Sequence, residues 1–363
     1  MILRLSLTNF RNYVKQCLEF SPGINLFTGE NGQGKTNILE AVFYLLSGKS
    51  LRVQREQELV RWGEKSFSLA GEFRHAAKEV KLESSYDGQL KFIRVNGVPC
   101  RRLSDFVGLI NVIFFAPDDL TMIKGGPGER RRFLDLHIAQ LKPGYVSLLN
   151  SYNKALLQKS SLLKAQVSPK SKQAQIELWN EQLLLLGTQL MQLRWEYAHE
   201  LNSLAQEVYA NIAWQRETME VAYLPLGEQD LDSALALYPR LLAEKIPLEI
   251  ERRVVLAGPH RDDLAIYLDG RNSRRFASQG QQRSIVLGLK LAQVEIMAQH
   301  RDEYPILLLD DVLSELDRFR RQYLLEFMAS SPVQTLITSA LGETAMAAGA
   351  RYIVQQGQIR RVV

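Results

Sequence analysis

The stretch that decides the fold is Gly29-Glu30-Asn31-Gly32-Gln33-Gly34-Lys35-Thr36, which fits the phosphate-loop pattern of spaced glycines followed by lysine and threonine. Ile24 to Thr28 precedes it as a predicted strand, and Asn37 to Leu46 follows with the apolar spacing of a helix. A glycine-rich turn with an incidental lysine is the alternative, but the strand and helix on either side disfavour it. The sequence therefore predicts a nucleotide-binding unit.

Each part of this loop has a chemical role in holding a nucleotide. Glycines allow main-chain N–H groups to surround the phosphates, and the helix N-terminus contributes the positive end of its dipole. Lys35 can reach the terminal phosphates, and Thr36 can bind Mg²⁺ through its hydroxyl. We therefore expect ATP and Mg²⁺ as ligands, the whole loop in the nucleotide site, and Lys35 among the catalytic residues.

A second acidic motif lies near the other end of the chain. Ile306 to Leu309 is fully apolar, as a buried strand requires, and the carboxylates of Asp310 and Asp311 follow directly. In a Walker B motif, Asp310 would enter the magnesium shell and Asp311 would orient or deprotonate the attacking water. A solvated strand end is the alternative, and the phosphate loop makes it the weaker one. We expect Asp310 and Asp311 to be catalytic.

A third motif, Ser278-Gln279-Gly280, opens a predicted helix. Ser278 could simply cap that helix. In an ABC-type ATPase, however, the same segment is the signature motif, which grips the γ-phosphate bound to a second subunit. The order of the motifs along the chain favours the ABC interpretation. The chain contains in turn the phosphate loop, an insertion, this motif, the Walker B strand and a D-loop, Ser314 to Asp317. We therefore place Ser278, Gln279 and Gly280 in the nucleotide site.

The rest of the chain alternates between two patterns. Ile2 to Phe10 alternates as a strand, and Phe67 to Val98 contains Asp-Gly and Asn-Gly turns that predict an antiparallel meander. Between the motifs, Tyr145 to Lys164 predicts a helix, and apolar residues at helical spacing from Ile176 to Val208 predict a longer one.

We expect the two helices to pair as an antiparallel lid packed on its own domain, rather than as an extended coiled coil. The predicted fold class is α/β, a P-loop ABC-type ATPase head with mixed sheets and an inserted α-helical arm. Residues 1–135 and 251–363 would form the head, and residues 136–250 the arm.

Composition adds little to these motifs. The chain has 363 residues, a net charge of +5 and a pI near 9.0, which weakly favours polyanionic partners. Cys17 and Cys100 form no metal-type or redox-type pair, so both are expected in the core of a protein from a reducing compartment. No segment is apolar for long enough to cross a bilayer, so we expect a cytoplasmic protein without a membrane partner.

Several segments resemble the RecF family over nearly the whole chain. They comprise Asn9 to Tyr13, Pro117 to Asp119, Gly125 to Pro127, Arg130 to Asp135, Gly258 to Asp263, and Leu308 to Asp311 with Ser314 to Asp317 and Arg321. The resemblance implies a head like that of SMC-type proteins with a helical lid, and we expect Arg11 among the ATP-binding residues. It further implies an ATP-dependent homodimer on single-stranded or duplex DNA and at gap junctions. RecO and RecR would be partners, with roles in gap repair, replication restart and SOS induction.

Two departures from the general ABC pattern predict slow ATP hydrolysis. Asp311 stands where a longer glutamate is usual, and no histidine follows His300, so Thr338 or Ser339 would take the place of the switch histidine. No glutamine can be placed at the Q-loop position, and Asp118 or Asp119, after the strand from Leu109 to Phe115, is a candidate for it. These features suit a timing switch in which two copies enclose two ATP molecules, each held by the loop of one copy and Ser278 of the other.

The DNA-contacting residues are left unassigned. Basic clusters occur at Arg130 to Arg132, Arg252-Arg253, Arg271, Arg274-Arg275 and Arg360-Arg361, which suit contact with the DNA backbone but equally suit internal ion pairs. A small-molecule kinase, a transporter-type ABC subunit and a binding-only structural protein are the alternatives. The kinase lacks the signature and D-loop, the transporter subunit lacks the helical insertion, and the intact Walker B carboxylates argue against a binding-only protein.

Overall fold

The computed structural model describes residues 1–76, 78–165, 169–340 and 349–362. The chain forms two compact units. The first contains Met1–Leu120 and Val286–Val363, and the second contains Thr121–Ile285. We call the first the head unit and the second the arm unit. These borders differ from the predicted ones at 135 and 251, because α3 (Pro127–Leu141) packs on α5 (Pro169–Ile212) and β10 (Asp263–Leu268), which belong to the arm unit.

A largely parallel sheet forms the centre of the head unit. Its order is β15-β14-β3-β13-β12-β8, and only the terminal β14–β15 hairpin is antiparallel. The strands are β3 (Ile24–Thr28), β8 (Val112–Phe115), β12 (Ile306–Asp310), β13 (Thr335–Ser339), β14 (Ala350–Gln355) and β15 (Gln358–Arg361). Because β3, β13 and β12 run parallel, their carboxyl ends meet at one edge, and this brings the loop after β3 to the carboxylates that end β12.

A second sheet of the head unit is antiparallel, in the order β2-β1-β4-β5-β6-β7. It contains β1 (Ile2–Phe10), β2 (Tyr13–Glu19), β4 (Phe67–His75), β5 (Lys78–Tyr86), β6 (Lys91–Val95) and β7 (Val98–Pro99). The predicted meander is confirmed, whereas β2 was not predicted. The prediction for the cysteines was wrong on burial: both are free, but Cys17 is exposed on β2 and Cys100 is only half-buried.

Helices and short turns complete the head unit. They are α1 (Lys35–Ser47), α10 (Val312–Glu315) and α11 (Arg318–Ser330), with 3-10 turns at Glu56–Leu59, Leu103–Asp105 and Pro117–Leu120. Helix α1 follows the glycine-rich loop and is apolar nearly all round, so most of its side chains are buried. It contacts both sheets, which fixes the loop at its N-terminus relative to β12 and β13.

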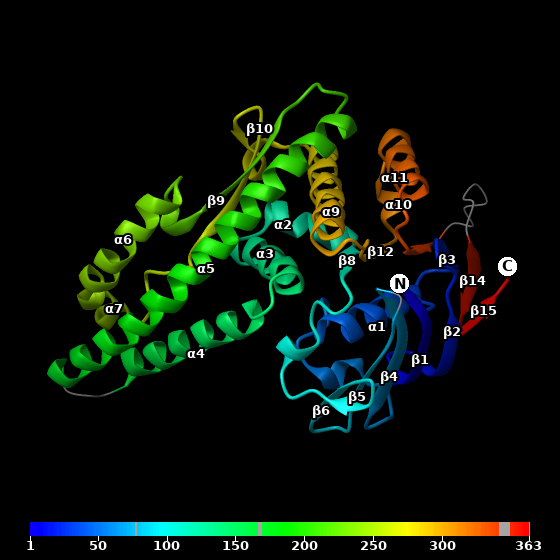
Figure 1. The fold of residues 1–363 in the computed structure, drawn as a ribbon, viewed down its shortest axis with the longest axis horizontal. Coiled ribbons are helices and arrows are strands. Elements are labelled where there is room, and N and C mark those ends of the chain that lie inside the picture. The colour runs from blue at the N-terminus through cyan, green and yellow to red at the C-terminus, as the bar shows by residue number, and fades with distance from the viewer. Residues whose placement is uncertain (77, 166–168, 341–348, 363) are drawn as a thin grey trace. The chain divides into compact units, whose positions relative to one another are not determined.

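The arm unit is built on a pair of long helices that lie side by side (Figure 1). Helix α4 (Tyr145–Lys164) has the predicted bounds, and α5 is the predicted long helix. Leu163 packs with Ile176, and Lys159 donates to Asn180, so the two helices run antiparallel. The prediction that the two helices pair as an antiparallel arm is therefore confirmed.

Smaller elements cover this helix pair. They are α2 (Thr121–Lys124), α6 (Leu231–Glu244), α7 (Ile246–Arg252), α8 (Ser273–Phe276), a 3-10 turn at Pro225–Gly227, and a three-stranded sheet of β9 (Met219–Leu224), β10 and β11 (Arg271–Asn272). Helix α9 (Gln279–Arg301) begins in the arm unit and ends in the head unit. None of the helices in the described part of the chain is both long and apolar enough to span a membrane.

Candidate nucleotide-binding site

The glycine-rich loop after β3 depends on glycine at two positions. Gly29 and Gly34 have φ values of 155° and 111°, which side chains rarely adopt. A Cβ atom at Gly29 would collide with the Val354 carbonyl oxygen, and one at Gly34 would collide with the Asn12 side chain. The loop can therefore pass close to β14 and to the loop after β1 only because these residues lack side chains.

Lys35 folds back over this loop. Its Nζ donates to the carbonyl oxygens of Gly29 at 2.6 Å and Glu30 at 2.9 Å, and only 7% of the residue is exposed. Burial lowers the pKa of Lys35, and the nearby carboxylates of Asp311 and Asp310 oppose that shift. The ammonium group is thus held inside the curve of the loop, where a phosphate oxygen could replace the carbonyl groups as its partner.

A hydrogen-bonded chain joins the loop to the end of β12. Thr36 Oγ1 and Thr338 Oγ1 both donate to Asp310 Oδ1 at 2.8 Å, and Thr338 Oγ1 accepts from the main-chain N–H of Asp311 at 2.9 Å. Burial raises the pKa of Asp310, which the two threonine hydrogen bonds oppose. The predicted pair Thr36 and Asp310 is therefore in direct contact.

Asp311 has an unusual conformation for a carboxylate at a strand end. Its φ is 51°, in the left-handed region, and its Oδ1 is buried with no hydrogen-bond partner among the described residues. A buried carboxylate oxygen without a partner is costly unless a ligand or water completes it. This oxygen lies at the same sheet edge as Lys35 and Asp310, so the geometry suits a group that contacts bound water or a metal ligand.

The loop between β1 and β2 braces the glycine-rich loop. Asn12 Nδ2 donates to the Gln33 carbonyl at 2.8 Å, Tyr13 donates its hydroxyl to the Gly34 carbonyl at 2.9 Å, and Asn37 Nδ2 donates to Asn12 Oδ1 at 2.9 Å. Burial raises the pKa of Tyr13, so its hydroxyl remains a donor. These contacts hold the carbonyl groups of the loop from outside and leave its main-chain N–H groups available.

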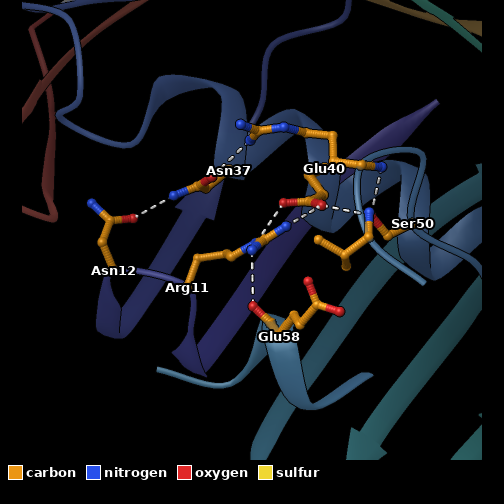
Figure 2. Close-up of polar contacts among 8 residues, drawn as sticks. Arg11, Asn12, Asn37, Glu40, Ser50 and Glu58 are labelled. Atoms are coloured by element: carbon orange, nitrogen blue, oxygen red, sulfur yellow. Dashed lines mark hydrogen bonds and ion pairs between the residues drawn. The ribbon is translucent and has the colours of Figure 1, made fainter. Parts of the chain in front are cut away.

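Arg11, from the same segment, forms a closed network of its own. Figure 2 shows its guanidinium facing the carboxylate of Glu40, with Nε and Nη2 each donating at 2.8 Å, while Nη1 donates to the Glu58 carbonyl at 2.8 Å. Ser50 donates its hydroxyl to the same carboxylate at 2.6 Å. Arg11 therefore ties α1 to the segment before β4, and its expected contact with ATP stays a prediction.

Comparison with known proteins identifies the family. The family model described as the RecF/RecN/SMC N-terminal domain matches residues 1–360. A curated relative, the DNA replication and repair protein RecF of Desulfitobacterium hafniense, is 53% identical over 99% of this chain and 98% of its own length. The chain belongs to the RecF family. The corresponding protein of Heliobacterium modesticaldum is 38% identical over 99% of both chains.

Solved structures agree with this family assignment. A structure of the recombination mediator protein RecF with ATP in the RecFOR pathway superposes with a TM-score of 0.91, at 32% identity, over 100% of this chain and 97% of that one. An SMC head bound to the C-terminal winged-helix domain of ScpA superposes with a TM-score of 0.61, at 16% identity, over 99% and 96% of the chains. The RecF-family chain therefore has the fold of an ABC-type ATPase head with a helical arm.

Within this RecF-family fold, the predicted site residues fall into two groups. Gly29 to Thr36, Asp310 and Asp311 come together in the head unit. Ser278, Gln279 and Gly280 belong to the arm unit, where Ser278 and Gln281 cap the start of α9 reciprocally, at 2.7 and 3.2 Å. Ser278 and Gln279 are both exposed. The capping role is therefore present, and the predicted contact of these residues with a nucleotide stays a prediction.

The structure changes the interpretation of two other sequence candidates. Arg130 is 4% exposed and forms a bidentate pair with Asp263 at 2.6 and 3.0 Å, so it is an internal ion pair and not a DNA contact. Asp119, a Q-loop candidate, pairs with Lys290 at 2.9 Å.

From the sequence, Asn12 and Tyr13 stood out only as part of a segment that resembles the family, and their contacts with the glycine-rich loop were not predicted. Their partners are main-chain carbonyls, which no sequence pattern reveals.

Proposed function

We propose that this chain is a cytoplasmic, slow, DNA-stimulated ATPase of recombinational repair, which closes as a homodimer on ATP and binds DNA at gaps. The observation that carries the proposal is the contact between Thr36 and Asp310, because it joins the glycine-rich loop to the carboxylate strand at one sheet edge. Membership of a family of DNA replication and repair proteins supports the assignment. The kinase and transporter alternatives are set aside, because the family match covers the chain from residue 1 to residue 360.

The nucleotide would lie on the main-chain N–H groups of Gly29 to Thr36. Lys35 would exchange its two carbonyl partners for oxygens of the terminal phosphates, a change from neutral to charge-assisted hydrogen bonds. Asn12 and Tyr13 hold the loop open during that exchange, because they bind carbonyl oxygens on its outer side. A solved relative with ATP supports ATP as the ligand.

The residues beside Asp310 fit a magnesium ion. Thr36 and Asp310 offer a hydroxyl and a carboxylate already in contact, and a cation there would relieve the raised pKa of Asp310. The described residues contain no group of three His, Cys, Asp or Glu that could hold a metal, so a magnesium ion here would also need phosphate and water ligands. Mg²⁺ at this position would neutralise charge on the phosphates.

Asp311 would position the water that attacks the terminal phosphate. Its unpartnered, buried Oδ1 is an acceptor that a water molecule can satisfy. An aspartate reaches less far than a glutamate, and Thr338, which bonds to Asp310 and the Asp311 main chain, is no proton acceptor comparable to histidine. These features support slow hydrolysis, so that the ATP-bound dimer persists on DNA.

Closure of the dimer would bring Ser278, Gln279 and Gly280 of one copy to the nucleotide of the other. Converting a mostly open population into a mostly closed one requires about 5.5 kcal/mol. Two shared γ-phosphates, each bound by charge-assisted hydrogen bonds and a helix N-terminus, can supply that energy. Hydrolysis would remove these contacts and release DNA.

DNA would be held by its backbone, with RecO and RecR as protein partners. Arg252, Arg253, Arg271, Arg274 and Arg275 are exposed in the arm unit, and such arginines suit phosphate contacts. The experiment is an ATPase assay with gapped, single-stranded and duplex DNA over a salt series. We expect DNA to stimulate hydrolysis, most with gapped DNA, and salt to weaken the effect. A rate indifferent to all three DNAs would contradict the proposal.

A further inference from the structure

The arm unit contains an open cavity of about 440 Å³ that the nucleotide site does not use. Its polar lining consists of Arg131, Ser160, His260 and Arg261, and its remaining wall is apolar. Pro127, the first residue of α3, also lines it, so the N-terminus of that helix lies at its edge. The cavity therefore combines positive charge with hydrogen-bond donors.

Both arginines of the cavity lack a carboxylate partner among the described residues. Arg131 Nη1 donates to the Asp262 carbonyl at 2.5 Å, and Arg261 Nη2 donates to the Val255 carbonyl at 2.9 Å. A guanidinium group carries several N–H donors in a planar fork, so most donors of each arginine are unused by the described protein atoms. Burial and the charge of Arg194 lower the pKa of Arg131.

The acidic residues nearest to these arginines are held by other groups. Asp262 accepts from the Tyr223 hydroxyl, and from the Leu226 N–H at 2.8 Å. Asp263 and Asp135 each form a bidentate pair with a different arginine, with shortest distances of 2.6 and 2.9 Å. Asp263 and Asp135 are thus matched by other arginines, and Asp262, which interacts with Arg131 electrostatically, directs its carboxylate to neutral donors, so the guanidinium donors in the cavity stay available to an anion.

His260 adds an oriented donor to this cavity. Its Nδ1 lies 2.7 Å from the Tyr152 hydroxyl, and burial lowers the pKa of His260 to about 4, helped by the charges of Arg261, Arg131 and Lys159. Burial raises the pKa of Tyr152, so its hydroxyl keeps a proton that it can donate to Nδ1, and this arrangement places the ring proton on Nε2. Among the described residues, the partner of Nε2 is the Val255 carbonyl, at a long 3.4 Å.

We propose that this cavity is a phosphate-binding site. Two guanidinium forks, an imidazole N–H and the Ser160 hydroxyl are the donor types that bind phosphate oxygens, and arginine binds them bidentately. Exposed Arg252 and Arg253 lead directly into Val254 and Val255, which line the cavity, and extend its positive field. The phosphate can belong to a DNA backbone or to a free phosphate or nucleotide, and both sources share this chemistry.

The site can be tested on the full-length, nucleotide-free protein by NMR of labelled histidine. The chain has five histidines, so the other four serve as internal controls, and a His260→Asn variant assigns the signal. Inorganic phosphate should shift the His260 ring resonances in a saturable manner. It should also raise the pKa of His260, because a bound anion offsets the field of Arg261, Arg131 and Lys159.

Variants separate a built site from a general charge effect. Arg261→Gln and Arg131→Gln should each weaken phosphate binding at least about fivefold. Arg240→Gln removes an exposed arginine of the same unit that lies outside the cavity and should leave binding unchanged. Arg261 is itself exposed, so its variant should fold normally even if that of Arg131 does not.

A short DNA duplex distinguishes the two sources of phosphate. A duplex that shifts the same resonance and competes with phosphate identifies the DNA backbone as the ligand, whereas phosphate binding without a response to duplex identifies free phosphate or a nucleotide. A His260 signal that phosphate leaves unmoved would overturn the site, as would Arg261→Gln and Arg131→Gln proteins that bind like Arg240→Gln. The titration contains no ATP, so a negative result leaves the proposed ATPase function intact.

Discussion

At the scale of single residues, the head unit uses buried charges for two different purposes. Lys35 and Asp310 keep hydrogen-bond partners that a ligand can replace or share, and Asp311 keeps an oxygen that has no partner among the described residues. Arg11 and Glu40 instead satisfy each other, with Glu40 2% exposed. Buried groups with replaceable partners suit ligand binding, whereas a closed ion pair suits the placement of neighbouring segments.

Lys35→Ala and Asp311→Asn should separate nucleotide binding from hydrolysis. Lys35→Ala removes a charged donor to the terminal phosphates and should weaken ATP affinity by about 10- to 100-fold. Asp311→Asn keeps the size of the side chain but removes its charge, so ATP affinity should change little while turnover is lost. Isothermal titration with ATP and Mg²⁺, beside a phosphate-release assay, measures both effects. Equal losses of affinity in the two variants would argue against these roles.

Glu40→Gln should destabilise the head unit. The change leaves the Arg11 guanidinium without its charged partner in a largely buried position, at a cost of about 2 kcal/mol. Glu58→Gln is the matched control, because Arg11 contacts only the main-chain carbonyl of Glu58. Thermal unfolding of the nucleotide-free protein should show a lower melting temperature for Glu40→Gln alone. Similar melting temperatures for both variants would mean that the ion pair contributes little.

Some residues of the site could be predicted from the sequence, and others could not. The loop, Asp310 and Asp311 could be predicted, because their residue types and spacing follow from phosphate and metal chemistry. The Arg11–Glu40 pair spans 29 positions and the Thr36–Asp310 bond spans 274, so only the fold brings them together. Cys17 was predicted to lie in the core because free cysteines are usually buried, but it is exposed on β2.

At the scale of elements, local patterns predicted α4 and α5, whereas helices α3 and α6 and strands β2 and β9 were not predicted. Helix α4 has the predicted bounds, because its apolar spacing and its flanking breakers are local signals. Strand β9 was not predicted, since its identity depends on pairing with β10, which follows two further helices. The same holds for β2, whose partners are β1 and the edge contact with β15.

Gly258 joins elements of the arm unit, and Gly258→Ala should destabilise it strongly. Its φ is 134°, and a Cβ atom there would stand 2.5 Å from the Tyr152 hydroxyl and 2.9 Å from that of Tyr238. Gly227→Ala is the control, because φ is 90° there but nothing lies within 4 Å of the added atom. We expect a loss of more than about 2 kcal/mol for Gly258→Ala and about 1 kcal/mol for Gly227→Ala. Urea unfolding compares them, and equal losses would show that the tyrosines move aside.

At the scale of the whole molecule, we propose that two copies of the chain share each nucleotide site. The loop and the Walker B carboxylates belong to the head unit, while Ser278 opens α9 in the arm unit with its side chain exposed. A second copy would supply the missing donors to the terminal phosphate. ATP would then control assembly, and the rate at which Asp311 permits hydrolysis would set the lifetime of the dimer on DNA.

The most direct test is sedimentation velocity of the wild-type protein and Ser278→Arg, with ATP and Mg²⁺. Wild type should sediment as a dimer at micromolar concentration with ATP and as a monomer without it. Ser278→Arg should remain a monomer, because a long cation would block the serine-capped helix, yet it should bind ATP with nearly wild-type affinity. A wild-type protein that stays monomeric with saturating ATP, or a Ser278→Arg protein that still dimerises, would contradict the account.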